Sequence, residues 1–297
     1  MFCLTIHEYR IMYICRLKQK RPMNSTLKSI LLWFFATIFT LVIAVYQRMT
    51  GPTYPVSGHV AIASQEINYK LIRTYAGADD AKVEIMVRDT SVRGEIQFRR
   101  FRSYDDWTLK PMIRKGDTLI GRVPHQDIAG KVMYNITLMQ GAQKFPLTKD
   151  PVVIRYKGDV PAWVLIPHIF FIFMAMLFST RTGLEVIFKG KSTVLYTWIT
   201  IITLVLGGLI LGPIVQKFSF NAYWTGWPFG HDLTDNKSLV AFIFWLVALF
   251  VLKKNRENKV WPIVASVILL IVFLIPHSML GSEIDFTKTQ QNKAVTK

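Results

Sequence analysis

Apolar residues in this chain are gathered into blocks that polar stretches separate, and this pattern constrains the fold more than any other feature. A helix needs about 20 apolar residues to cross the roughly 30 Å hydrocarbon core of a bilayer. The chain is 51% hydrophobic and only 19% charged, which is typical of a membrane protein. We therefore predict five transmembrane helices, over residues 27–46, 162–178, 194–215, 239–252 and 261–280.

The formal net charge of +17 would indicate nucleic-acid binding in a soluble protein. Here many of the lysines and arginines flank the apolar blocks, where positive charge holds a loop on the cytoplasmic side. We therefore expect the lipid bilayer as a partner and no nucleic acid. The blocks themselves contain almost no charged residues, which argues against an ion-transport path.

The positions of the basic residues also predict the topology. They precede the first block and fill the loops after the second and the fourth, namely Arg16, Lys18, Lys20, Arg21 and Lys28, then Arg181, Lys189 and Lys191, then Lys253, Lys254, Arg256 and Lys259. These three segments should be cytoplasmic. The N-terminus is then cytoplasmic, and residues 50–158, the loop 216–238 and the C-terminal tail 281–297 lie outside. Nothing requires a eukaryotic secretory route, so we expect a multi-pass protein of a bacterial inner membrane.

The segment 1–26 is predicted to be a basic cytoplasmic N-terminus, with Met23 as an alternative start. The first apolar block is long for a signal peptide, and no small-x-small cleavage site follows it. We therefore favour an uncleaved anchor, with a cleaved signal peptide as the alternative. Cys3 and Cys15 both precede this block, so no disulfide framework is implied outside the cell.

Residues 50–158 have the pattern of a β-domain. Short runs with apolar residues at alternate positions are separated by turn signals, and they predict strands at residues 56–63, 83–87, 94–101, 118–123, 132–139 and 152–156. Strands at this spacing are typical of a β-sandwich. The segment 129–138, Ala-Gly-Lys-Val-Met-Tyr-Asn-Ile-Thr-Leu, resembles the penultimate strand of an immunoglobulin-like or fibronectin-like module, which implies an inward-facing Tyr134.

The predicted fold is therefore an α + β membrane protein. Five transmembrane helices carry one extracytoplasmic β-sandwich domain, inserted between the first and second helices. The remaining helices form a four-helix bundle over residues 162–280.

The loop between the third and fourth blocks is the first candidate site. Residues 221–237 combine large aromatic side chains with carboxylates, and we single out Trp224, Trp227, Asp232 and Asp235 as residues that could bind a ligand or partner. The alternative is structural, because Trp and Tyr favour the membrane interface and a carboxylate can cap the next helix.

Histidines form the second candidate site. The tetrapeptide Leu-Ile-Pro-His occurs twice and places His168 and His277 near the outer ends of two helices, on the same side as His231. Imidazole binds zinc, copper and haem iron, so these three residues are a candidate transition-metal or haem site. In the alternative, His168 and His277 donate hydrogen bonds to helix carbonyls.

No diagnostic catalytic motif is present: the chain has no Walker A loop, HExxH, GxSxG or dinucleotide fingerprint. The basic run Arg99-Arg100-Phe101-Arg102 is either a solvated face paired with acids or a patch for anionic lipid or a protein partner. The sequence favours a non-enzymatic binding or assembly module that presents its β-domain to a membrane or extracytoplasmic protein. A redox, haem or metal-handling subunit is the first alternative, and a small transporter or enzyme that uses the 221–237 loop is the second.

Overall fold

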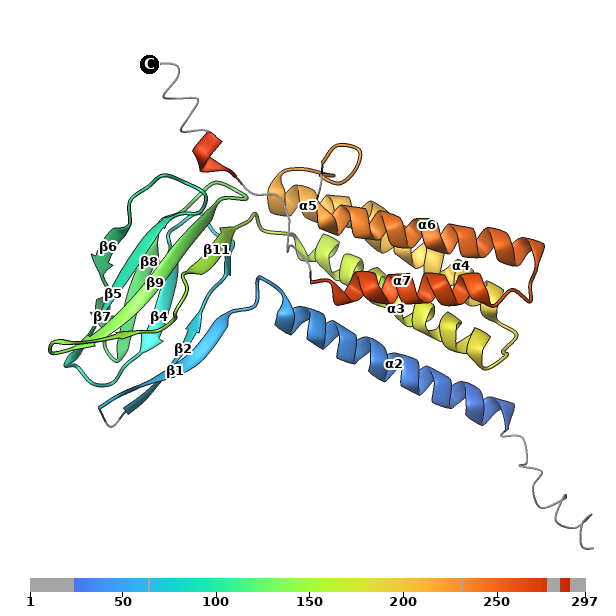
Figure 1. The fold of residues 1–297 in the computed structure, drawn as a ribbon, viewed down its shortest axis with the longest axis horizontal. Coiled ribbons are helices and arrows are strands. Elements are labelled where there is room, and N and C mark those ends of the chain that lie inside the picture. The colour runs from blue at the N-terminus through green and yellow to red at the C-terminus, as the bar shows by residue number, and fades with distance from the viewer. Residues whose placement is uncertain (1–23, 64, 231, 277–283, 289–297) are drawn as a thin grey trace, which may run out of the picture.

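The computed structural model describes residues 24–63, 65–230, 232–276 and 284–288. Figure 1 shows two parts: a β-domain, strands β1 to β11, at one end, and a group of helices that point away from it. The chain is α + β, and its sheets are open. Within the described residues, four helices are long and apolar enough to cross a membrane. We call the end of the helices beside the β-domain the domain-side end and the other the far end.

The helices correspond to the five predicted blocks, although their ends differ. They are α2 (Ser25–Thr50), α3 (Ala162–Ile187), α4 (Thr193–Leu204), α5 (Gly212–Phe220), α6 (Leu233–Lys254) and α7 (Val260–Leu274). A π-helix, η1 (Val205–Leu211), joins α4 to α5, so residues 193–220 form one long element. With 15 residues α7 is shorter than a full span. It ends at Leu274 and Ile275 is extended, so the predicted helix is too long at residues 275 and 276, and residues 277–280 lie outside the described residues.

Four of the predicted blocks are shorter than the observed helices, and in α3 and α6 the difference adds buried charged side chains. Helix α6 begins at Leu233 because Asp232 caps it, with its Oδ1 accepting from the amide of Thr234 at 2.8 Å. Helix α3 runs on to Ile187. The helices therefore contain buried charged side chains that the apolar blocks leave out: Arg181, Glu185, Asp235 and Lys237.

The β-domain contains three sheets around one buried core. The strands are β1 (Val56–Ile62), β2 (Gln65–Leu71), β3 (Thr74–Tyr75), β4 (Ala81–Met86), β5 (Val92–Arg100), β6 (Thr108–Pro111), β7 (Ile113–Lys115), β8 (Thr118–Val123), β9 (Lys131–Gln140), β10 (Gln143–Pro146) and β11 (Val152–Tyr156). The largest sheet has the order β3-β11-β9-β5-β6, with β10 also paired to β9; the other sheets are β4-β8-β7 and the hairpin β1-β2. Buried side chains from all three sheets form a single hydrophobic cluster.

All six predicted strands are present, and alternation explains why they could be predicted. In β5 and β9 every second residue is buried, as expected when one face of a sheet covers a core. Tyr134 faces inward as predicted: it is fully buried, and its hydroxyl donates to the Ile72 carbonyl at 2.8 Å. Burial raises the pKa of Tyr134 far above its ordinary value, so this hydroxyl stays a donor. The likeness to immunoglobulin-like or fibronectin-like modules stays a prediction.

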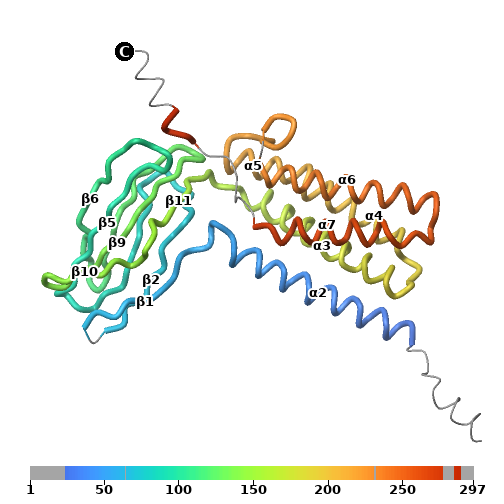
Figure 2. The backbone as a smooth tube through the Cα atoms, in the orientation of Figure 1, coloured from blue at the N-terminus to red at the C-terminus, as the bar shows by residue number. Residues whose placement is uncertain are grey.

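The β-domain and the helices meet at a joint made of main-chain and side-chain contacts. The amide of Gly158, after β11, donates to the Ser219 carbonyl in α5 at 3.0 Å. The guanidinium of Arg155 lies over the Phe220 ring at 4.3 Å. The described part of the C-terminal tail, 284–288, packs against the β-domain, where the Thr287 amide donates to the Arg102 carbonyl at 3.0 Å. Figure 2 shows this tail segment beside the β-domain, so residues 284–288 lie against a part of the chain that is distant in the sequence.

Candidate functional site

The edge formed by β6 and β7 is a candidate binding surface of the β-domain, because both strands end a sheet. Strand β6 ends the largest sheet and β7 ends the three-stranded sheet, and the chain passes from one to the other at Met112. The amide of Met112 donates to the Gly94 carbonyl at 2.7 Å, which fixes this crossing. We call residues 108–115 the β6–β7 edge.

Apolar side chains stand on the β6–β7 edge. Every residue of β6 is exposed, and Leu109 and Ile113 are 58% and 66% exposed. In each strand one row of main-chain donors and acceptors has no neighbouring strand among the described sheets. Such an edge is a template for an added strand, and exposed apolar side chains increase the gain from covering it.

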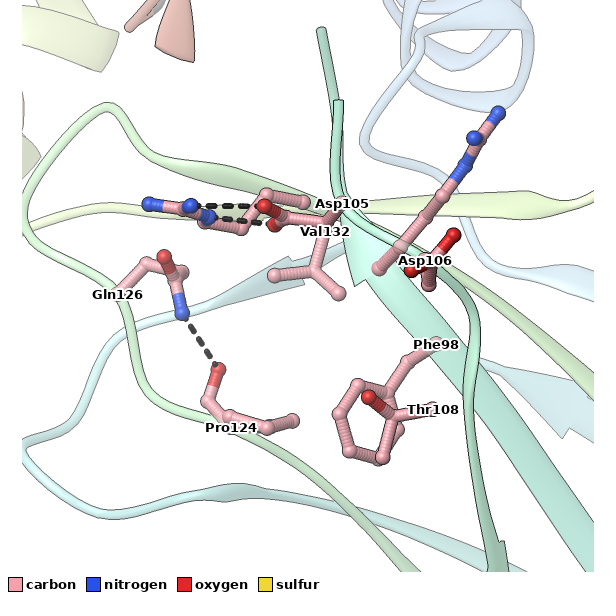
Figure 3. Close-up of a pocket in the computed structure, with 9 residues that line it drawn as sticks. Phe98, Asp105, Asp106, Thr108, Pro124, Gln126 and Val132 are labelled. Atoms are coloured by element: carbon pink, nitrogen blue, oxygen red, sulfur yellow. Dashed lines mark hydrogen bonds and ion pairs between the residues drawn. The ribbon is translucent and has the colours of Figure 1, made fainter. Parts of the chain in front are cut away.

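A pocket of about 250 Å³ lies beside the start of this edge (Figure 3). Arg100 donates from Nε and Nη2 to the two Asp105 oxygens at 2.6 and 2.8 Å, and the dashed lines in Figure 3 mark this pair. The hydrogen bond with Asp105 raises the pKa of Arg100. Because Asp105 already occupies the guanidinium fork, an anion would have to compete with it. The pocket is lined by Phe98, Arg99, Arg100, Asp105, Asp106, Thr108, Pro124, Gln126 and Val132.

The other two arginines of the predicted basic run lie on aromatic rings. Arg99 stacks over Trp107 at 4.9 Å, and Arg102 over Phe101 at 5.7 Å. The Arg100–Asp105 pair fits the interpretation of a solvated face paired with acids, whereas the ring contacts of Arg99 and Arg102 were not predicted. A role of this run in contacting anionic lipid or a protein stays a prediction.

The 221–237 loop is closed by its own carboxylates. One Asp235 oxygen accepts from the amides of Thr225 and Gly226 at 2.7 and 3.0 Å, and Asp235 is buried. The Thr225 hydroxyl donates to Asp232 at 3.2 Å and accepts from Gln216 at 2.6 Å. Both predicted acids therefore hold the loop against α5 and α6, and a ligand role for them stays a prediction.

The predicted tryptophans of this loop lie differently. Trp224 is half-buried, and its indole N–H donates to the Trp227 carbonyl at 3.0 Å. Trp227 is 68% exposed. The sequence interpretation missed two other polar contacts, Asn236 with the Trp227 amide at 2.6 Å and Lys237 with the Ile275 carbonyl at 2.8 Å. The sequence signal for these two contacts is the polar run directly after Asp235. This run resembles a loop, although it lies in the first turns of α6, which begins at Leu233.

Of the three predicted histidines, the structure describes one. His168 lies in α3 with its Nδ1 2.9 Å from the Gly207 carbonyl in η1, so it contacts a helix carbonyl as the second interpretation expects. A carbonyl can only accept, so Nδ1 carries the proton in this hydrogen bond. His231 and His277 lie outside the described residues. Within the described ranges no three metal-capable side chains lie together, and the metal site stays a prediction.

A buried ion pair at the far end of the helices was missed by the sequence interpretation. Arg181 and Glu185 of α3 form a hydrogen-bonded pair with side chains only 2% and 7% exposed. The guanidinium lies over the rings of Tyr196 in α4 and Trp33 in α2, at 5.0 and 5.4 Å. The available signal was the four-residue spacing of opposite charges directly after an apolar block.

Comparison of the chain with protein-family models, with curated proteins and with solved structures found no match.

Proposed function

We propose that the chain is an integral membrane protein that crosses the bilayer five times, with a cytoplasmic N-terminus. The β-domain, as a sandwich of the immunoglobulin-like or fibronectin-like kind, then stands outside, on the domain-side end of a helix bundle. The distribution of charge supports this orientation, because the basic residues of the loops gather at the far end of the helices. There Lys28 donates to the Phe188 carbonyl at 2.6 Å and Lys253 lies over the Trp198 ring at 5.3 Å.

The short helix α7 can be the fifth transmembrane crossing if the bilayer becomes thinner around it. Its 15 residues span about 22 Å, and a bilayer adapts to a short helix at a modest cost per ångström. The topology stays a proposal, as does the bacterial inner membrane as its setting.

We infer that the protein is a non-enzymatic binding or assembly module, and that its β-domain recognises an extended segment of an extracytoplasmic protein. The β6–β7 edge is the observation that carries this proposal. A partner strand would pair with the free main-chain groups and cover Leu109 and Ile113. Lys110 and Lys115 on the same edge favour a segment that also carries acidic residues.

Photo-crosslinking in native membranes tests this function. A photoreactive residue at Ile113, which is 66% exposed, should capture a partner, and the matched site Met86 on β4, which is 64% exposed, should not. The same partner should be lost from the purified complex by Leu109→Arg together with Ile113→Arg and kept by Met86→Arg. Equal capture at Ile113 and Met86 would contradict the proposal that the β6–β7 edge binds the partner. So would a partner that stays bound to the Leu109→Arg, Ile113→Arg variant.

A second candidate function rests on the orientation of His168. Metal-bound histidines usually donate their other ring N–H to a carbonyl or carboxylate, and the bond to the Gly207 carbonyl gives His168 this arrangement. With His231 and His277 it could hold a transition metal or haem in a redox or metal-handling subunit. An absorption spectrum and a metal analysis of one detergent-purified sample test this. We expect bound metal or a Soret band to be lost in His168→Ala and kept in His125→Ala, which changes an exposed histidine of the β-domain.

A further inference from the structure

The loop that connects α5 to α6 turns its polar groups inward and its aromatic rings outward. Residues 221–230 are held by Asp235 and by Asn236, whose Oδ1 accepts from the Trp227 amide at 2.6 Å. The rings that face away from these contacts are strongly exposed: Tyr223 is 59%, Trp227 68% and Phe229 83% exposed. The hydrogen bonds to Asp235 and Asn236 fix the loop backbone, and with it the direction in which the exposed rings point.

More aromatic side chains lie at the same end of the helices. Trp163, at the start of α3, is 71% exposed and lies edge-on to Phe218 of α5, with 6.5 Å between the ring centroids. The loop projects sideways from the bundle, beside α5 and near the start of α6, and does not reach over the β-domain (Figure 1). The loop and Trp163 therefore place exposed aromatic rings at the domain-side end of the apolar helices.

We propose that residues 221–230, with Trp163 and Phe218, form an anchor that inserts into the interfacial zone of the outer leaflet. Three observations favour lipid as the occupant. The rings continue the surface of helices that are apolar enough to span a membrane. The loop itself has no charged residue between Asn221 and Gly230. The neighbouring Lys217 lies over the Tyr223 ring at 5.3 Å and donates to Asn221, and a lysine at the end of a helix can reach the headgroups. Tryptophan and tyrosine combine an apolar ring with a polar edge, which suits the headgroup boundary.

This inference rests on the proposed topology, and it fixes the depth and rotation of the bundle. A helix bundle can tilt or slide in a bilayer unless interfacial side chains hold it. An anchor on one flank would hold α5 and the start of α6 at the outer boundary, and with them the joint at Ser219 on which the β-domain rests.

A fluorescent label tests the anchor in the full chain. Cys3→Ser and Cys15→Ser remove the native thiols, and Phe229→Cys then carries an environment-sensitive label at a highly exposed position. The protein is placed in phosphatidylcholine–phosphatidylglycerol vesicles with lipids brominated near the headgroup or near the chain end. Ile38→Cys on the exposed face of α2 reports the hydrocarbon core, and Asp117→Cys in the β7–β8 turn reports water.

We expect the label at position 229 to be quenched several-fold more by bromine near the headgroup than the label at position 117. At position 38 we expect stronger quenching by bromine near the chain end. The anchor is wrong, and the topology stands, if the label at position 38 is quenched while the label at position 229 is quenched as little as the water-exposed label at position 117. A blue-shifted but unquenched label at position 229 means a protein contact and also overturns the anchor. If position 38 is not quenched, the topology fails and the anchor with it.

Discussion

Single carboxylates in this protein organise loops through hydrogen bonds to neighbouring donors. Asp89, before β5, accepts from the Ser91 amide at 2.8 Å and from the Gln140 side chain at 3.0 Å. The hydrogen bonds from Ser91, that of its side chain first, hold the pKa of Asp89 below its ordinary value. The charged form is therefore favoured in the folded state.

This lowered pKa predicts how stability depends on pH. A carboxyl whose pKa is lowered by folding contributes stability above its unfolded pKa and loses it as the pH falls through the folded value. We expect Asp89→Asn to lower the thermal midpoint at neutral pH and to flatten its decline on the acid side. Asp150→Asn, at an exposed loop position, is the control and should leave the profile unchanged. An unaltered acid limb in Asp89→Asn would show that the hydrogen bonds to Asp89 add nothing.

The buried pair Arg181–Glu185 joins three helices at the far end. Glu185 accepts from the Ser192 amide at 2.9 Å, ahead of α4, while Arg181 lies on the rings of Trp33 and Tyr196. In α2 the buried side chains are few, Ala36 and Thr40 among them, and much of its surface is exposed apolar residues. The stack on Trp33 is therefore a principal specific contact that places this helix.

Removing one member of the pair should cost more than removing both. Arg181→Ala leaves the Glu185 carboxylate buried without its counter-charge, and we expect a loss of about 3–5 kcal/mol. The double change Arg181→Met with Glu185→Leu removes both charges and fills the space, so its loss should be smaller. Thermal unfolding in detergent, followed by tryptophan fluorescence, compares the two. A double variant that is less stable than Arg181→Ala would contradict this account.

Elements with strong periodicity could be predicted from the sequence, and elements without it could not. Strands β5 and β9 alternate because one face covers the core, and their predicted ranges are close to the observed ones. Strand β6 is exposed at all four residues, so it has no alternation to detect. The start of α6 was placed too late because Asp235 and Lys237 look like loop residues until their partners across the fold are known. The candidate site depends on such long-range contacts, and sequence spacing does not encode them.

On the scale of the whole molecule, the joint couples the β-domain to the helices. Gly158 has no room for a side chain, because a Cβ there would lie 2.1 Å from the Phe218 carbonyl oxygen. We expect Gly158→Ala to separate the two backbones and to break the bond from this amide to Ser219. The amide of residue 158 would then lose its acceptor, and its hydrogen exchange should rise well above that of the same amide in Asp159→Ala, which changes the exposed neighbouring residue. Unchanged exchange would mean that the two parts stay together without this contact.

The π-helix η1 has a consequence for how this chain tolerates insertions and deletions. A π-helical turn holds one more residue than an α-helical turn, so the seven residues of η1 offset the direction of α5 from that of α4. Deleting one residue between 205 and 211 would restore the ordinary winding and rotate α5 by about 100°. Gln216 would then turn away from Thr225, and the Gly207 carbonyl would leave His168. A surface loop accepts a change of one residue in its length. In η1 the same change would displace the 221–230 loop, the contact of His168 and the joint at Ser219 together.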